Sequence, residues 1–279
     1  MAGTYRLSDI RNNIPILKSY MGLILEKCRG KTVNEIKKYC HTICSELKEH
    51  YIQTFKYFSS KKKMDKGMLG KLCEQLIFGQ EPNCKSEPDL LCGVEIKTTH
   101  FKSLLKGGIN AKERIKIGAV GNKADYNTFQ NIVDNDLFTK CKHFKKCDKM
   151  IIFVFLHENS KKYCTFENTL NKKLLHIALV DYNNFSDEWK TQIQKDYDLI
   201  RDQCIMFCID GYPDHITQSG QKLLHIHSVG VKGSTAKGFG YTPKFLTRII
   251  ARDLEQNYGF IDCLKKKGNS IYIDKSVFV

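Results

Sequence analysis

Apolar side chains recur at helical intervals through residues 8–58 of the chain. The pattern breaks at Arg29, Gly30 and Lys31 and stops at a polar, lysine-rich stretch over residues 59–63. Residues 66–78 resume a helical pattern, bounded by Gly67 and Gly79. The spacing therefore predicts a helical N-terminal region over residues 1–60, followed by a second region over residues 61–279.

Strand-like patterns follow the last of these helices. Residues 94–98 alternate between apolar and polar side chains, as do residues 223–231. Residues 150–156 are apolar on both faces, which indicates a central strand covered by helices, and residues 174–180 repeat this pattern. Helices are predicted over residues 131–146, from Ser186 to about residue 204, and over residues 243–257. Residues 102–127 are expected to form a loop and residues 230–240 a glycine-rich turn. The fold class expected is α/β (or α+β), with a mixed central β-sheet flanked by helices.

The composition describes a folded basic protein. The chain of 279 residues has 45 Lys and Arg against 30 Asp and Glu, a formal charge of +15, and 42% hydrophobic residues. Such an excess of positive charge makes a polyanion the first partner to consider, and nucleic acid comes before a membrane surface because no segment has a lipid-facing stripe.

Twelve cysteines do not change this view. The first residues lack the charged and apolar segments of a secretory signal, and no apolar run approaches the roughly 20 residues that span a bilayer. The cysteines are therefore expected to be reduced and mostly buried, in a protein of the cytoplasm. Their spacing does not make the paired motif of a structural zinc site.

Ionisable residues interrupt the predicted strand over residues 94–98. Glu95 and Lys97 lie two positions apart, so on a strand they point to the same side, about 6.6 Å apart, and share one exposed edge. Asp89 lies six residues earlier, across a turn at Gly93. Two carboxylates beside phosphate oxygens are a usual Mg²⁺ site, and Lys97 would orient water or stabilise developing charge. The alternative is a surface ion pair, since Glu-x-Lys occurs three more times in this chain, each time in a helical pattern.

A helix precedes this strand, and its polar face carries Glu74. The order Lys66-Gly-x-x-Gly-x-x-x-Glu74, then Pro-Asp89, then Glu95-x-Lys97-Thr, resembles the family of the mismatch-repair nicking endonuclease MutH and the related type II restriction endonucleases that cut at GATC, within the PD-(D/E)xK nuclease superfamily. The resemblance covers about residues 64–255. It implies a restriction-endonuclease-like fold over residues 61–279, with a metal-dependent centre at Glu74, Asp89, Glu95 and Lys97. It also implies Mg²⁺ held by Asp89, Glu95 and the backbone carbonyl of Ile96.

Two further segments are similar to elements of this family. The family places a further catalytic lysine just before a central apolar strand, where Lys146 is the best match and Lys145 and Lys149 are the alternatives. The segment from Lys237 to Thr247 resembles the basic and aromatic segment that these enzymes use against DNA, and it follows a strand with His225 and His227 that resembles one near the bases. The DNA-binding residues expected are Lys66, Lys116, Lys232, Lys237, Tyr241 and Lys244.

The function expected is a Mg²⁺-dependent, sequence-specific endonuclease acting on double-stranded DNA, most simply a type II restriction enzyme at a GATC-like site. A double-strand cut at a palindrome needs two active centres, so this function implies a homodimer on DNA. One alternative is a monomeric nicking enzyme of the repair class. Another is a DNA-binding protein without activity, whose acidic residues are structural, and a third is an enzyme that degrades RNA.

Overall fold

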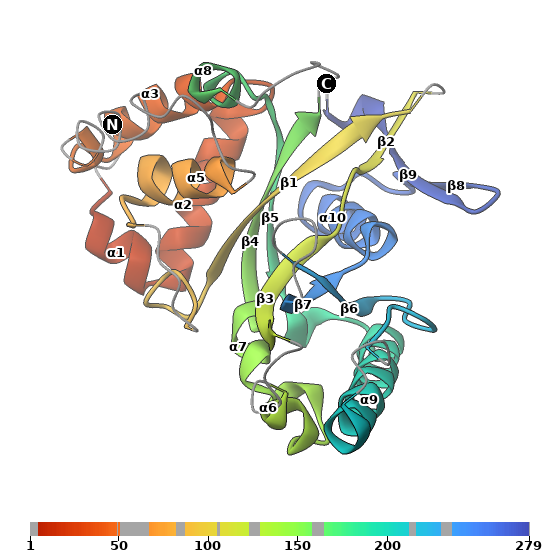
Figure 1. Ribbon diagram of the computed structural model, residues 1–279. Helices are drawn as coiled ribbons and strands as arrows, with labels where there is room; N and C mark the ends of the chain where they lie inside the picture. The colour runs from red at the N-terminus through yellow and green to blue at the C-terminus, as the bar shows by residue number, and fades with distance from the viewer. Residues whose placement is uncertain are drawn as a thin grey trace.

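The structure is a computed structural model and describes residues 5–48, 50, 67–81, 87–104, 107–122, 129–157, 165–211, 216–229 and 236–278. Its centre is a six-stranded sheet in the order β5-β4-β1-β2-β9-β8 (Figure 1). The strands are β1 (Glu95–Ser103), β2 (Gly108–Ala111), β4 (Lys149–His157), β5 (Leu174–Asp181), β8 (Leu264–Lys267) and β9 (Ser270–Asp274). The pair β1 and β4 is parallel, whereas the other neighbours are antiparallel. The fold is therefore mixed α and β, as the sequence pattern predicts.

Four N-terminal helices cover one face of this sheet: α1 (Leu7–Asn12), α2 (Ile14–Cys28), α3 (Val33–Ile43) and α5 (Met68–Phe78). The chain turns between α2 and α3 at Gly30, whose φ of +76° suits glycine, and a capping box between Thr32 and Glu35 begins α3. The apolar faces of the helices form one hydrophobic core with Ile96 of β1 and with Ile151, Phe153 and Phe155 of β4, together with short α8 (Phe166–Leu170). The helical region and the sheet thus share a core.

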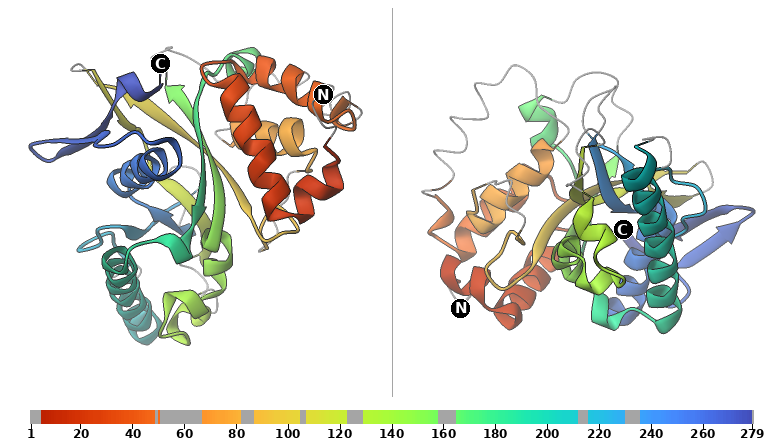
Figure 2. Two further views of the ribbon diagram at one scale, coloured as in Figure 1. Left: turned by 180° about the vertical axis from the view of Figure 1, so that it is seen from behind. Right: turned by 60° about the horizontal axis from the view of Figure 1, so that its bottom comes forward.

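The opposite face of the sheet lies against a second core. This core contains α9 (Asp187–Asp210), α10 (Pro243–Tyr258) and a three-stranded sheet in the order β3-β7-β6 (Figure 2). The strands of the small sheet are β3 (Ile115–Asn122), β6 (Leu224–Ser228) and β7 (Ala236–Tyr241). Ser186 caps α9 by accepting a hydrogen bond from the backbone amide of Trp189. Since β4 is buried on both faces, its run of apolar residues has packing partners on each side.

Three sequence-based expectations are wrong at the level of elements. The loop expected over residues 102–127 contains the end of β1, then β2 and β3, and the turn expected over residues 230–240 contains β7. Glycine is uncommon in strands, but in β7 the backbone carbonyl of Ile115 and the ring of His227 approach Gly240 too closely for a side chain. The helix expected over residues 131–146 is divided into α6 (Gln130–Val133), α7 (Lys145–Asp148) and two 3-10 turns, because Phe138 turns into the aromatic core. The hairpin of β8 and β9 is not among the elements expected from the sequence, although Ile271 and Ile273 alternate with more polar residues in β9.

The described cysteines are free thiols and most of them are buried, in agreement with the expectation from composition. Within the ranges that the structure describes, no helix combines the length and apolar character needed to cross a membrane.

Candidate active site

Glu95, the first residue of β1, lies beside two lysines at the N-terminal end of this strand. Its side chain is only 2% exposed, and its Oε1 accepts hydrogen bonds from Lys97 and, at 3.3 Å, from Nζ of Lys146. Its Oε2 is also buried and has no hydrogen-bond partner among the described residues. The sequence predicted an exposed edge here, and for the carboxylate this is wrong. The group is buried, with one oxygen paired to two ammonium groups and the other unpaired.

The parallel pairing of β1 with β4 brings Lys146 to this place. The register sets Glu95 opposite Met150, so α7, which immediately precedes β4, lies beside the start of β1. The sequence left three lysines open as the family's additional lysine. Lys145 instead forms an ion pair with Glu87, and Lys149 pairs with Asp148, whereas Lys146 contacts Glu95. Geometry therefore selects Lys146.

A tight turn brings Asp89 to the same place. Gly93 has a φ of +80°, and the amide of Leu90 donates to the carbonyl of Val94 at 3.0 Å, which folds the chain back before β1. Asp89 Oδ2 then accepts a hydrogen bond from the backbone amide of Ile96 at 2.9 Å. The oxygen Oδ2 of Asp89 is thus held by the strand. If Asp89 binds a metal, the other oxygen, Oδ1, would be the ligand.

Glu74 approaches from helix α5. This helix packs on β1 where Gly70 lies beside Thr98, since a methyl group at Gly70 would contact Oγ1 of Thr98 at 3.5 Å. Burial, and next the negative charge of Asp89, raise the pKa of Glu74 to about 7, while Lys97 acts in the opposite direction. Burial also raises the pKa of Glu95, against the lowering effect of Lys97. These shifts couple four residues that are separate in the sequence, so the expected cluster of Glu74, Asp89, Glu95 and Lys97 is brought together.

The donor set fits Mg²⁺ in chemistry and in number, although its side chains do not converge. Mg²⁺ prefers oxygen ligands and takes one or two carboxylates, with water and substrate phosphates completing its shell. Glu95 Oε2 is a buried carboxylate oxygen without a partner, and Asp89 is its acidic neighbour. In the described parts of the chain, no three His, Cys, Asp or Glu side chains are placed to hold a metal together. The Mg²⁺ site that the acidic residues of this cluster can provide therefore consists of two carboxylates, those of Glu95 and Asp89. Ile96 follows Glu95 directly in β1, and the role of its carbonyl stays a prediction.

Thr99 is a neighbour that the motif did not include. It lies on β1 two positions after Lys97, so its side chain is on the same face as those of Glu95 and Lys97. Its Oγ1 is buried and without a hydrogen-bond partner among the described residues. The alternation of the strand, continued past Lys97, indicates Thr99 as a third side chain on this face.

The residues expected to bind DNA differ in where they lie. Lys116 on β3 and Lys244 at the start of α10 are exposed, and Lys66 and Lys232 lie outside the described residues. For the other two, the expectation of a surface position is wrong. Lys237 is buried, and its Nζ donates to the carbonyl of Ile216 at 3.2 Å. Tyr241 is fully buried in the aromatic core, 5.1 Å from the ring of Phe245.

His225 and His227 occupy buried positions on β6. Their side chains share one face of the strand, and their rings lie 5.0 Å apart. Burial lowers the pKa of His225 to about 4 and that of His227 to about 3, and the positive charge of Arg114 contributes to both shifts. Both rings are therefore neutral at physiological pH, and both lie inside the protein and not on an exposed face of the strand.

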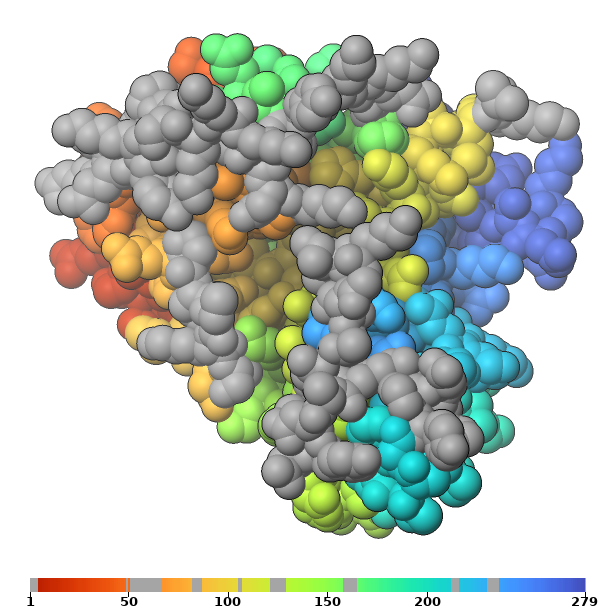
Figure 3. Space-filling model, viewed as in Figure 1, coloured from red at the N-terminus to blue at the C-terminus, as the bar shows by residue number. Residues whose placement is uncertain are grey.

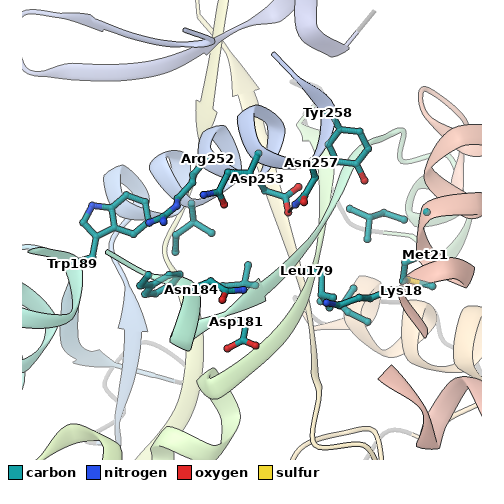
Figure 4. A pocket seen from close by; sticks show the side chains of 17 residues that line it. Lys18, Met21, Leu179, Asp181, Asn184, Trp189, Arg252, Asp253, Asn257 and Tyr258 are labelled. Carbon is teal, nitrogen blue, oxygen red and sulfur yellow. Dashed lines mark hydrogen bonds between the residues drawn. The ribbon is translucent and has the colours of Figure 1, made fainter. Parts of the chain in front are cut away.

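A separate pocket of about 330 Å³ lies at the outer edge of β5 (Figure 4). Side chains from α2, β5 and α10 line it, among them Lys18, Asp181 and Arg252, and the guanidinium of Arg252 lies over the ring of Trp189 at 5.1 Å. None of the residues predicted from the sequence to be catalytic, metal-binding or DNA-binding lines this pocket. The candidate active site is therefore the cluster around Glu95 and not this pocket.

Comparison of the chain with models of protein families and with curated protein sequences finds no match. The resemblance to the MutH-like nucleases is therefore a prediction from sequence motifs, and the geometry around Glu95 is the structural observation that bears on function.

Proposed function

We propose that the chain is a Mg²⁺-dependent endonuclease that hydrolyses phosphodiester bonds in double-stranded DNA. The observation that supports this most is the buried carboxylate of Glu95, which has two lysines on one oxygen and no partner on the other. Burying ionic groups is unfavourable for folding unless they are well paired, so an incompletely paired cluster is typical of a functional site. Asp89 and Glu74 add acidic groups at the same place.

The roles of the residues follow from charge and position. Bound Mg²⁺ would polarise the phosphate and lower the pKa of a water molecule. Asp89 and Glu95 supply oxygens for the metal. Lys97 and Lys146 are 19% and 16% exposed, so they reach both the buried carboxylate and a phosphate at the surface, where they would orient water and stabilise negative charge that develops on the phosphate. Glu74, with a pKa near 7, is poised to accept or donate a proton at physiological pH.

The finer assignments are part of the same proposal. We propose a restriction enzyme of the cytoplasm, acting as a homodimer at a short GATC-like palindrome, because cutting both strands requires two copies of the site. A nicking enzyme would act as a monomer. Linear and nicked plasmid products distinguish the two.

Plasmid cleavage tests the site. Wild-type protein is expected to cut in Mg²⁺ and to be inactive in EDTA. Glu95→Ala and Lys97→Ala are each expected to lower the cleavage rate by about 10²-fold or more, since each removes a group that acts on the reacting phosphate. Glu188→Ala is the matched control, because Glu188 belongs to a Glu-x-Lys tripeptide on the surface of α9. Full activity in both site variants would show that the centre lies elsewhere.

The same assay distinguishes the alternative functions. A wild-type protein that binds duplex DNA without cutting it would be a DNA-binding protein only, and one that cuts RNA and spares duplex DNA would be a ribonuclease.

A further inference from the structure

One part of the six-stranded sheet has a face that the N-terminal helices do not cover. Near the start of β1 these helices pack on Ile96 and Thr98, and on β4 they reach Phe155. Figure 3 shows the N-terminal helices on one side of the molecule, and β2, β8 and β9 on the other. Among the residues that the structure describes, the far end of β1, together with β2, β9 and β8, is therefore covered on one face only, where Ile109 and Ile273 belong to the core with α10.

The strand register identifies the side chains on the uncovered face. Lys102 of β1 lies opposite Asn110 of β2 and His157 of β4, and Tyr272 of β9 lies opposite Lys265 of β8. Paired residues point to the same side of a sheet, and alternate residues share a face. We call this surface the basic face. It consists of His100, Lys102, Asn110, Lys112, His157, Lys265, Lys267, Ser270, Tyr272 and Asp274.

The basic face carries more positive than negative charge. Its four lysines are exposed, and in the described part of the chain Lys102, Lys265 and Lys267 form no ion pair. One acid, Asp274, belongs to the face itself, and a second, Glu113, lies beside it. Glu113 is 3.7 Å from His100, and Asp274 accepts hydrogen bonds from the amide and hydroxyl of Ser276.

Protection of a sheet edge explains some of these lysines but not Lys102. Lysine on an edge strand prevents pairing with other chains, and this accounts for Lys265 and Lys267 on β8. Lys102 lies on β1, an interior strand that pairs with β4 and β2. Its charge therefore requires another reason.

The basic face is also held firmly in place. The ring of Tyr272 packs on Gly108, where no other residue would leave room for it. The side-chain amide of Asn110 donates to the carbonyl of Ile271 at 3.3 Å, and Ile273 is fully buried beneath. Lysines carried on a rigid, slightly twisted sheet are presented at fixed spacings, which suits a regular polyanion.

We propose that the basic face binds the sugar–phosphate backbone of duplex DNA, as a contact separate from the candidate active site. This inference rests on the proposed nuclease function for the choice of partner. Glu95 and Lys102 lie seven residues apart on β1, a distance of about 23 Å. Seven is an odd number of positions, so their side chains point to opposite faces of the strand. The same distance spans about seven base pairs of duplex at 3.4 Å per pair, so the basic face would contact backbone that flanks the site at about this distance from the bond that is cut.

The triple variant Lys102→Ala, Lys265→Ala, Lys267→Ala tests this. Binding to a duplex of about 30 base pairs is measured in EDTA by fluorescence anisotropy over a range of salt concentrations. Each phosphate contact contributes about 0.9 to the slope of log K against log salt, so the slope is expected to fall by about 2 to 3. At moderate salt the affinity is expected to fall about tenfold to hundredfold. The cleavage rate at saturating protein should be unchanged, because none of these lysines contacts Glu95.

The matched control is Lys18→Ala, Lys27→Ala, Lys38→Ala. It removes the same charge from exposed positions on α2 and α3. Its salt slope is expected to equal that of the wild type, and replacement of the three basic-face lysines by arginine should preserve binding. Equal salt slopes in the two triple-alanine variants would overturn the proposal that the basic face binds DNA. A wild-type protein that does not bind duplex DNA would also overturn it. Loss of slope in the basic-face triple alone, in a wild-type protein that binds DNA but never cuts it, would support the face and overturn only the proposed function.

Discussion

Glu95 combines burial with a hydrogen-bonding arrangement that is only half complete. One oxygen accepts from Lys97 and Lys146, and the other has no partner among the described residues. Burial alone would raise the pKa of this carboxyl strongly, and the two ammonium groups oppose that shift. A carboxylate that is buried and has one unpaired oxygen is suited to binding a cation, which would supply positive charge next to that oxygen.

Lys146 provides the most direct comparison at the scale of single residues. Lys146→Ala is expected to lower the rate of DNA cleavage by about 10²-fold to 10⁴-fold, since its Nζ lies at the site. Lys145→Ala and Lys149→Ala remove the same charge from the same short segment and should change the rate little, because their partners are Glu87 and Asp148. The measurement is a single-turnover cleavage assay of the three variants. Equal losses in all three would indicate a general effect of charge and no specific role for Lys146.

Glu74 predicts a dependence of stability on pH in protein without divalent metal. Its pKa is about 7 in the folded protein against an ordinary value of 4.5, so the folded state holds this proton more tightly than the unfolded state does. The stability that the proton contributes is complete below about pH 4.5 and is lost as the pH rises through 7. Glu74→Gln is therefore expected to be more stable than the wild type by about 1–3 kcal/mol at pH 8, and similar to it near pH 4.5. Urea unfolding at several pH values measures this. A difference between the two proteins that is the same at every pH would contradict it.

At the scale of elements, one acidic residue connects α9 to β6. Asp196 is fully buried, and its carboxylate accepts hydrogen bonds from the backbone amides of Lys222, Leu223 and Leu224 at 3.0, 2.6 and 2.9 Å. These amides belong to the entry into β6, the strand that carries His225 and His227. The helix thereby fixes where the strand begins.

Asp196→Ala is expected to lower the free energy of unfolding by about 3 kcal/mol or more, because it leaves two buried amides and one partly buried amide without acceptors. Asp198→Ala on the exposed side of the same helix should cost less than about 0.5 kcal/mol and serves as the control. Chemical denaturation followed by circular dichroism gives both values. A small effect of Asp196→Ala would mean that water or a rearranged loop satisfies the three amides.

At the scale of the whole molecule, the N-terminal helices and the sheet depend on one another. Ile96, Ile151, Phe153 and Phe155 are buried by the helical layer, and all four are at most 3% exposed. Glu74 reaches the active site from the last helix of this layer. The helical region that the sequence marks off at residue 60 thus takes part in the core beneath the site.

Removal of residues 1–60 is therefore expected to expose a large apolar face and to abolish cooperative folding. The shortened protein should be insoluble, or should bind a hydrophobic dye and lack a sharp thermal transition, whereas the full chain unfolds in one transition. Calorimetry and dye binding check this. A shortened chain with a sharp, two-state transition would show that residues 61–279 fold on their own.

The amino-acid pattern is sufficient for the fold class, for the positions of β4, β5 and α10, and for the arrangement of Glu95 and Lys97 on one strand. These features depend on periodicity and caps, which involve residues close together in the chain. The pattern does not set every boundary, since β1 continues to Ser103 and α9 to Asp210, beyond the ends predicted near residues 98 and 204. The strands β3 and β7 are not evident from the pattern, because their glycines interrupt it and because β3 pairs with β7 across more than a hundred residues.

Three features are not contained in the amino-acid pattern. They are the choice of the lysine that joins Glu95, the depth at which that carboxylate is buried, and the position of Lys237 and Tyr241 inside the protein. Each of these depends on the register of β1 with β4, or on the packing of β7 against the aromatic core. Contacts of this kind join residues far apart in the sequence. The local sequence pattern does not predict these contacts, because a lysine or a tyrosine can occupy either a surface loop or a buried strand, depending on the residues that pack around it.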